Sequence, residues 1–229
     1  MGGAALGASV SDGPVAMAAG SLGIFGGTFD PIHFAHLALA QEAADALGLE
    51  RVLFVPAGRP PHKPGVAITP GKDRLAMVEL AIAGNDRFAA SRAELERDGL
   101  SYTVDTLESL AASRHADGRG GELTLILSAD AFMGLPSWRD PRRVLELARL
   151  AVAPRDGFPD AGPGFLATHF PDQADRAVFL DGPRLRLSAS TLRDRAAAGR
   201  SLRYLVPDAV AAYIGDHGLY RNPKRNDQT

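Results

Sequence analysis

The segment Ser21-Leu22-Gly23-Ile24-Phe25 is a short apolar run that stops at Gly26-Gly27. A run of this length, ended by glycines, is typical of a buried β-strand. The next segment predicts a helix that ends near Gly48, because apolar residues recur there at helical spacing. These apolar positions are Leu37, Ala40, Ala44 and Leu47. The chain therefore begins its fold with a strand, a glycine turn and a helix.

The same alternation continues outward from this unit. Further strands are expected at 51–55, 88–97 (one or two short ones), 123–127, 150–153, 177–180 and 184–187. Helices are expected at 72–83, 103–112 and 141–148, and from Ser190 and Pro207 onward. Loops without clear periodicity fill 56–71 and 154–176. Apolar strands that alternate with helices predict a Rossmann-like, doubly wound parallel sheet with helices on both faces.

Composition limits the function classes. The 229 residues include no cysteine, which excludes disulfides, thiolate zinc sites and a cysteine nucleophile. The net charge of -2 argues against nucleic acid as a partner, and no apolar run approaches the roughly 20 residues that span a bilayer. We expect a cytoplasmic protein with one domain over 21–221, a disordered extension over 1–20 and a polar tail over 222–229.

The richest chemistry follows the first strand, in GGTFDPIHFAH over 26–36. Gly26 and Gly27 let backbone N–H groups approach phosphate oxygens closely, and a helix begins a few residues later. His33 and His36 are three apart, so they point the same way and can donate to a triphosphate. A zinc site is an alternative for two histidines, but the His-Glu-x-x-His pattern of helical metalloproteases is absent.

A second polar cluster, SASTLR over 188–193, lies at an expected helix start. Ser190, Thr191 and Arg193 can converge on the phosphates of ATP, since arginine offers a planar fork of donors. Helix capping explains the hydroxyls equally well. Lys63 and Trp138 also have interpretations without a binding role: Lys63 as a solvated loop lysine, and Trp138 as an aromatic residue of the core.

The two clusters resemble known motifs. GGTFDPIHFAH is similar to the T/H-x-G-H signature of the nucleotidylyltransferase superfamily, with Ala35 in place of a glycine. SASTLR is similar to the I-S-S-T-x-I-R motif of the same superfamily.

Four further segments resemble the bacterial nicotinate mononucleotide adenylyltransferases. They are P-P-H-K at 60–63, S-Y-T-x-D-T at 101–106, the S-A-D of 128–130 with its downstream Trp138, and a tail over 204–220. The third departs from the family's G-x-D by Ser128, and the tail is expected to serve as apolar packing.

This resemblance implies transfer of the AMP moiety of ATP to nicotinate mononucleotide. Mg²⁺ is then expected to bind mainly through the ATP phosphates, without a metal site of the protein's own. The implied catalytic residues are His33, His36 and Arg193. The implied ATP-binding residues are Gly26, Gly27, Thr28, Phe29, His36, Asp130, Ser190, Thr191 and Arg193. The implied acceptor-binding residues are Lys63, Thr103 and Trp138.

Two rival functions stay open on the sequence. One is a sister transferase with another acceptor, such as 4′-phosphopantetheine. The other is a nucleotide-binding protein without catalysis. Whether the chain forms a homo-oligomer is open as well.

Overall fold

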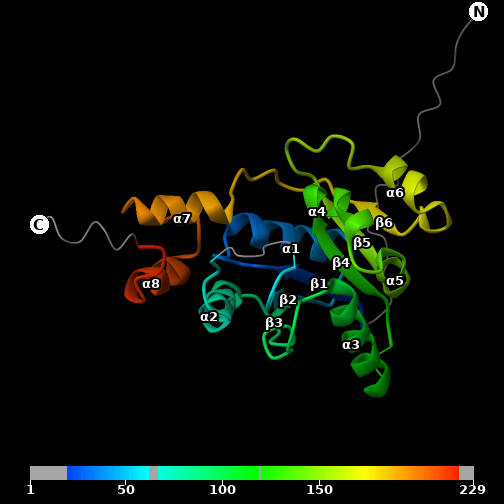
Figure 1. Cartoon of the computed structure of the whole chain (residues 1–229), viewed down its shortest axis with the longest axis horizontal. Coiled ribbons are helices and arrows are strands. Elements are labelled where there is room, and N and C mark those ends of the chain that lie inside the picture. The colour runs from blue at the N-terminus through cyan, green and yellow to red at the C-terminus, as the bar shows by residue number, and fades with distance from the viewer. Residues whose placement is uncertain (1–19, 62–66, 119, 222–229) are drawn as a thin grey trace, which may run out of the picture.

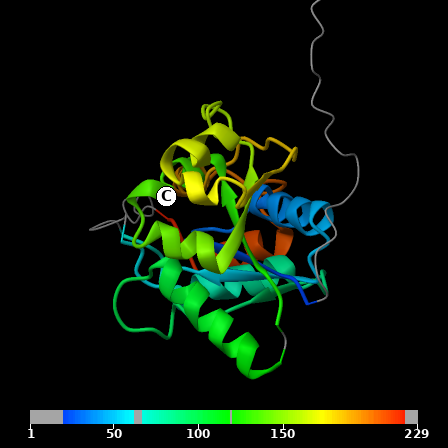
Figure 2. The ribbon, with the colours of Figure 1, turned by 90° about the vertical axis from the view of Figure 1, so that its right-hand side faces the viewer.

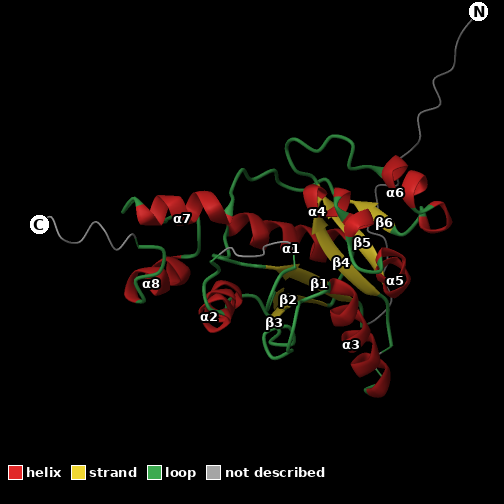
Figure 3. Cartoon of the chain, in the orientation of Figure 1, coloured by secondary structure: helices red, strands yellow, loops and turns green. Residues whose placement is uncertain are grey.

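A computed structural model of the chain describes residues 20–61, 67–118 and 120–221. These residues form one six-stranded sheet in the order β3-β2-β1-β4-β5-β6, with every neighbouring pair parallel (Figures 1 and 3). The strands are β1 (Leu22–Gly27), β2 (Arg51–Pro56), β3 (Phe88–Ala90), β4 (Leu123–Ser128), β5 (Ala148–Ala153) and β6 (Ala177–Phe179). The predicted doubly wound parallel sheet is confirmed.

Helices connect the strands and cover both faces of the sheet. They are α1 (Phe34–Ala46), α2 (Gly71–Ile82), α3 (Thr103–Ala116), α4 (Ala129–Met133), α5 (Pro141–Leu147), α6 (Pro163–His169), α7 (Ala189–Ala197) and α8 (Asp208–Asp216), with 3₁₀ turns η1 (Leu135–Ser137) and η2 (Pro171–Gln173). Figure 2 shows α1 and α3 on opposite sides of the sheet. Within the described part of the chain, no helix is both long and apolar enough to cross a membrane.

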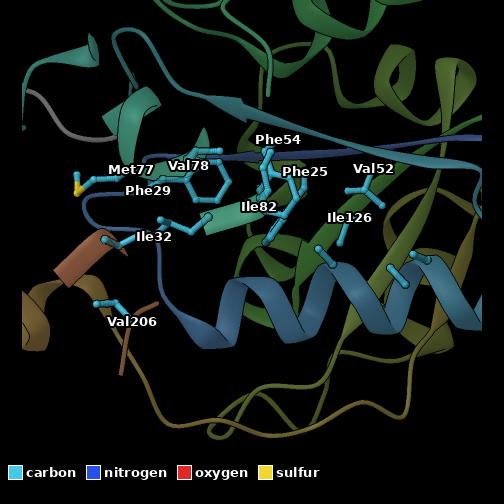
Figure 4. Close-up of a cluster of buried hydrophobic side chains, with 14 of the residues drawn as sticks. Phe25, Phe29, Ile32, Val52, Phe54, Met77, Val78, Ile82, Ile126 and Val206 are labelled. Carbon is cyan, nitrogen blue, oxygen red and sulfur yellow. The ribbon is translucent and has the colours of Figure 1, made fainter. Parts of the chain in front are cut away.

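Two hydrophobic cores lie on the two faces. Successive strand residues point to opposite faces, so Phe25 and Ile126 join the core under α1 and α2, whereas Ile24 and Leu125 join the core under α3 and α5. Figure 4 shows the first of these cores packed between the sheet and α1. Because both faces are covered, the central strands are mostly apolar.

The order of the strands fixes the place of the site. The chain moves outward from β1 through β2 to β3, then returns to pair β4 with the other side of β1. In open α/β sheets, ligands bind beyond the carboxyl ends of the strands at such a reversal. Gly26-Gly27 and Ser128 end the two strands that meet there.

Of the strand regions predicted at 88–97 and 184–187, the first contains one short strand and the second is wrong. Over 88–97 only Phe88–Ala90 is a strand, because Leu95 and Glu96 both donate backbone hydrogen bonds to the Arg92 carbonyl and close a turn. Over 184–187 the structure has no strand. The Arg-Leu-Arg-Leu alternation mimics one, but Leu187 N–H donates to the Leu185 carbonyl in a tight turn.

The segment 154–176, expected to be a loop, contains α6 and η2. Pro163 stands at the first turn of α6, where a proline costs no hydrogen bond. Leu166 and Phe170 are buried in the second core and anchor the segment. The helix has only seven residues, too few for a periodic pattern to be recognised in the sequence.

Candidate active site

A cavity of about 520 Å³ lies beyond the carboxyl ends of β1, β4 and β5, where the strand order reverses. Residues from five segments line it. They include Gly26, Gly27, His33, His36, Ser128, Arg155, Arg184, Arg186, Ser188 and Thr191. The cavity therefore brings together the glycine pair, the histidine pair and the start of α7, which the sequence had predicted to meet.

The glycine turn leaves room for a ligand on one side only. A Cβ on Gly26 would meet nothing within 4 Å, whereas a Cβ on Gly27 would lie 2.9 Å from the ring of Phe29. Phe29 has φ 50, an unusual backbone angle for an aromatic residue, and its side chain is buried in the first core. Phe29 and Thr28 do not line the cavity, and Thr28 turns its carbonyl toward the buried Arg74.

The two histidines lie against each other. Their rings stack with centroids 3.7 Å apart and an interplanar angle of 17°. The backbone N–H of His33 donates to Nδ1 of His36 at 3.2 Å, so a neutral His36 carries its proton on Nε2. The pair stands at the first turn of α1, with His33 as the residue before the helix.

Burial keeps both imidazoles neutral. Burial and then the nearby positive charge of Arg155 lower the pKa of His33 from 6.5 to about 4. Burial, the neighbouring His33 and Arg155 lower the pKa of His36 well below its ordinary value. At neutral pH the pair therefore offers hydrogen-bond donors and no positive charge.

Arg155 is a cavity residue that the sequence did not reveal. It follows the end of β5, and its Nη1 contacts both carboxylate oxygens of Asp130 at 3.0 Å. Asp130, predicted to bind ATP, lies just after β4 but does not itself line the cavity. The available signal was position, because Arg155 follows the carboxyl end of a predicted strand.

Arg184 and Arg186 were also missed, because their alternation with leucines predicted a strand. Both line the cavity, and Arg186 Nε donates to Asp156 at 2.7 Å. Together with Arg155 they give the cavity wall three guanidinium groups. Such a wall attracts anions.

The start of α7 shows the capping role that the sequence allowed, and it also borders the cavity. Ser188 caps the helix, since its Oγ accepts from Thr191 N–H at 3.2 Å. Thr191 lines the cavity, while Ser190 lies just outside it and its Oγ is 3.2 Å from that of Ser188. Arg193 Nη1 donates to the Asp30 carbonyl at 2.7 Å, so this predicted phosphate ligand contacts the turn after β1 instead of lining the cavity.

Two of the three predicted acceptor residues, Thr103 and Trp138, lie in segments that meet at the start of α3. The Arg139 guanidinium, next to Trp138, lies 4.7 Å from the ring centroid of Tyr102 and 3.4 Å from the Asp105 carboxylate. Thr103 begins the helix between these two residues. Neither Thr103 nor Trp138 lines the 520 Å³ cavity. Lys63 lies outside the described residues.

Hydrogen bonds hold the loop after β2 against the start of α3. Ser101 Oγ accepts from the N–H groups of Gly58 and Arg59 at 3.0 and 3.1 Å. A Cβ on Gly58 would lie 2.2 Å from the Glu94 carbonyl oxygen, so only glycine fits there. These contacts hold the chain that leads toward the P-P-H-K segment next to the start of α3.

Three carboxylates near the cavity are engaged by other groups. Asp130 pairs with Arg155, Asp156 pairs with Arg186, and Asp30 accepts from Tyr220. Among the described residues, no group of three or more histidine and acidic side chains could hold a metal ion. This donor set fits a Mg²⁺ ion that is held by substrate phosphates and water.

The fold and the site define a class of protein. The family model described as cytidylyltransferase-like matches residues 24–195, which is most of the chain. The chain therefore belongs to the cytidylyltransferase-like nucleotidyltransferases.

Relatives narrow the class. A probable nicotinate-nucleotide adenylyltransferase of Roseiflexus sp. (strain RS-1) is 49% identical over 205 residues, covering 90% of this chain and 100% of the relative. Another from Thermomicrobium roseum is 46% identical over 200 residues, covering 87% and 91%. Within its family, the chain is a member of the nicotinate-nucleotide adenylyltransferases.

Solved structures share the fold. The nicotinic acid mononucleotide adenylyltransferase of Plasmodium falciparum, complexed with NaAD, has a TM-score of 0.72 at 18% identity. The match covers 87% of this chain and 97% of that one. The same protein complexed with APC has a TM-score of 0.70 at 17% identity.

Proposed function

We propose that this protein transfers the AMP moiety of ATP to the phosphate of nicotinate mononucleotide and releases pyrophosphate. The observation that carries the proposal is the pair of neutral, stacked histidines beside two glycines at one wall of the cavity. The family membership and the substrate named for the relatives support the choice of acceptor.

The transfer is a single in-line displacement at the α-phosphorus, without a covalent enzyme intermediate. The attacking oxygen belongs to the acceptor's phosphate and is ionised at neutral pH, so the reaction needs no strong base. Catalysis then consists of positioning and stabilisation of developing charge. His33 and His36 donate hydrogen bonds to the reacting phosphates, with Nε2–H as the donor of His36.

The remaining contacts divide between the two substrates. Backbone N–H groups of Gly26-Gly27 and of the α7 start hold the triphosphate, together with Ser190, Thr191 and Arg193. Mg²⁺ bound to these phosphates would neutralise their charge. Asp130 binds the nucleotide once Arg155 has turned to the phosphates.

On the acceptor side, Lys63 neutralises the phosphate, Trp138 stacks on the pyridine ring and Thr103 holds its far end. The contacts at the α3 start support this assignment, because Arg139 joins the segments of Thr103 and Trp138. The hydrogen bonds to Ser101 hold the loop after β2 beside them.

Product analysis tests the reaction, and stereochemistry tests its course. The purified protein with ATP, Mg²⁺ and nicotinate mononucleotide should yield dinucleotide and pyrophosphate in equal amounts. With an α-thiophosphate ATP of known chirality, a single displacement inverts the configuration at phosphorus. Retention would mean a covalent intermediate, and His33→Ala turnover near that of the wild type would remove His33 from the catalytic assignment.

A further inference from the structure

The turn that joins β1 to the histidines is held by segments far apart in the chain. Arg74 Nη1 on α2 donates to the Thr28 carbonyl at 2.8 Å. Thr69 N–H donates to Oδ2 of Asp30 at 3.2 Å. The Tyr220 hydroxyl, near the end of the described chain, donates to Oδ1 of the same carboxylate at 2.6 Å.

Asp30 is the centre of this network. It is 3% exposed, and both of its carboxylate oxygens accept a hydrogen bond. Its backbone carbonyl accepts from Arg193 Nη1 of α7 at 2.7 Å. Only Pro31 and Ile32 separate it from His33. A shift of Asp30 therefore moves the histidine pair and α7 relative to each other.

Tyr220 adopts a costly backbone conformation to make its contact. Its φ is 63, in the left-handed region that aromatic residues rarely enter. Phe29, which precedes Asp30, has φ 50. Non-glycine residues keep such angles only where the surrounding structure holds them, and they cluster at functional sites. The sequence predicted apolar packing for this tail and did not reveal the polar contact.

We propose that Tyr220 is a positioning residue of the triphosphate site, which acts through Asp30 on His33 and Arg193. The inference rests on the adenylyl transfer proposed above. The hydroxyl holds Oδ1 of Asp30 while Thr69 N–H holds Oδ2, so that the turn after β1 cannot relax away from α7. Burial, and then the Asp30 carboxylate, raise the pKa of Tyr220, so its hydroxyl stays a donor over the whole working pH range.

The chain offers a matched control for the test. Tyr213 on α8 donates its hydroxyl to Oδ1 of Asp73 at 2.9 Å. Tyr220→Phe and Tyr213→Phe therefore each remove one tyrosine-to-aspartate hydrogen bond and keep the ring. Only the first of these bonds reaches the turn that carries the histidines.

We expect both variants to lower Tm, and Tyr213→Phe by no more than Tyr220→Phe, because the Tyr213 hydroxyl is the less buried of the two. Tyr220→Phe should also lose about tenfold in kcat/KM for ATP, with KM for nicotinate mononucleotide within about twofold of the wild type. Tyr213→Phe should keep the kinetics of the wild type. In a double-mutant cycle, adding Asp30→Asn to Tyr220→Phe should cost less than the sum of the single changes, because one residue acts through the other.

If Tyr220→Phe has the same kcat/KM for ATP as Tyr213→Phe, the proposal is overturned and Tyr220 has a structural role only. If the wild type transfers no adenylyl group, the proposed function fails separately. The affinity of each variant for a non-hydrolysable ATP analogue then tests the positioning role of Tyr220. Binding about tenfold weaker in Tyr220→Phe than in Tyr213→Phe supports that role, and equal binding overturns it.

Discussion

The histidine pair makes the stability of the protein depend on pH. His33 is 4% exposed, and its pKa is lowered from 6.5 to about 4 by burial and then by Arg155. Between these two values the unfolded chain binds a proton at this residue that the folded chain does not bind. Stability is therefore lost as the pH falls from 6.5 toward 4.

The gap between the two pKa values corresponds to about 3 kcal/mol once the pH is below both of them. Between about pH 7 and about pH 5, the same two values give a loss of about 2 kcal/mol from His33 alone. His36 adds to the loss in the same direction, because its pKa is lowered as well.

Urea unfolding followed by the fluorescence of Trp138, the sole tryptophan, measures this effect. The free energy of unfolding is measured at about pH 7 and about pH 5 for the wild type and for His33→Gln. Between these pH values, the unfolding free energy of the variant should fall by about 2 kcal/mol less than that of the wild type. His217→Gln, at an exposed histidine after α8, is the control and should behave as the wild type does. If the unfolding free energy falls equally with pH in the wild type and in His33→Gln, the conclusion that His33 is buried in its neutral form is refuted.

Three further comparisons of variants test separate parts of the structure. Gly27→Ala should destabilise the protein by about 1–3 kcal/mol, because its Cβ would lie 2.9 Å from an aromatic ring, whereas a Cβ at Gly26 would meet open space. Equal melting temperatures of Gly27→Ala and Gly26→Ala would contradict this packing. Arg155→Met should lower kcat/KM for ATP by about tenfold to a hundredfold and Arg155→Lys by less, and steady-state kinetics that match the wild type would exclude a phosphate role. Thr106→Val removes a hydroxyl that donates to a buried carboxylate at 2.7 Å and should cost about 1–3 kcal/mol in urea unfolding. Thr124→Val changes a buried hydroxyl without a partner in the described structure and should cost nothing. A larger loss of unfolding free energy in Thr124→Val than in Thr106→Val would overturn the stabilising role of the Thr106 hydrogen bond.

The order of elements and the glycine–histidine turn could be predicted because they leave local signals. The strand before Gly26 is a continuous apolar run, and His33 and His36 have helical spacing, so sequence alone placed them together. In the structure their side chains lie side by side with stacked rings, a detail that the sequence did not predict.

Contacts between distant residues could not be predicted in this way. Arg155 meets Asp130 only because β5 pairs with β4, and Tyr220 meets Asp30 across 190 positions of the chain. Arg184 and Arg186 were hidden by an alternating pattern that a strand and an irregular cavity wall share. Arg193 shows the same limit, because its local motif indicated a phosphate ligand while the fold adds a contact to the Asp30 carbonyl.

The most direct test of the central claim is pyrophosphate release with ATP and Mg²⁺ in the presence of three acceptors. These are nicotinate mononucleotide, nicotinamide mononucleotide and 4′-phosphopantetheine. We expect kcat/KM to favour the nicotinate acceptor by ~100-fold or more over each of the others, about 2.7 kcal/mol of transition-state discrimination. ATP binding without pyrophosphate release from any of the three would contradict the proposed reaction and leave a nucleotide-binding protein on this fold.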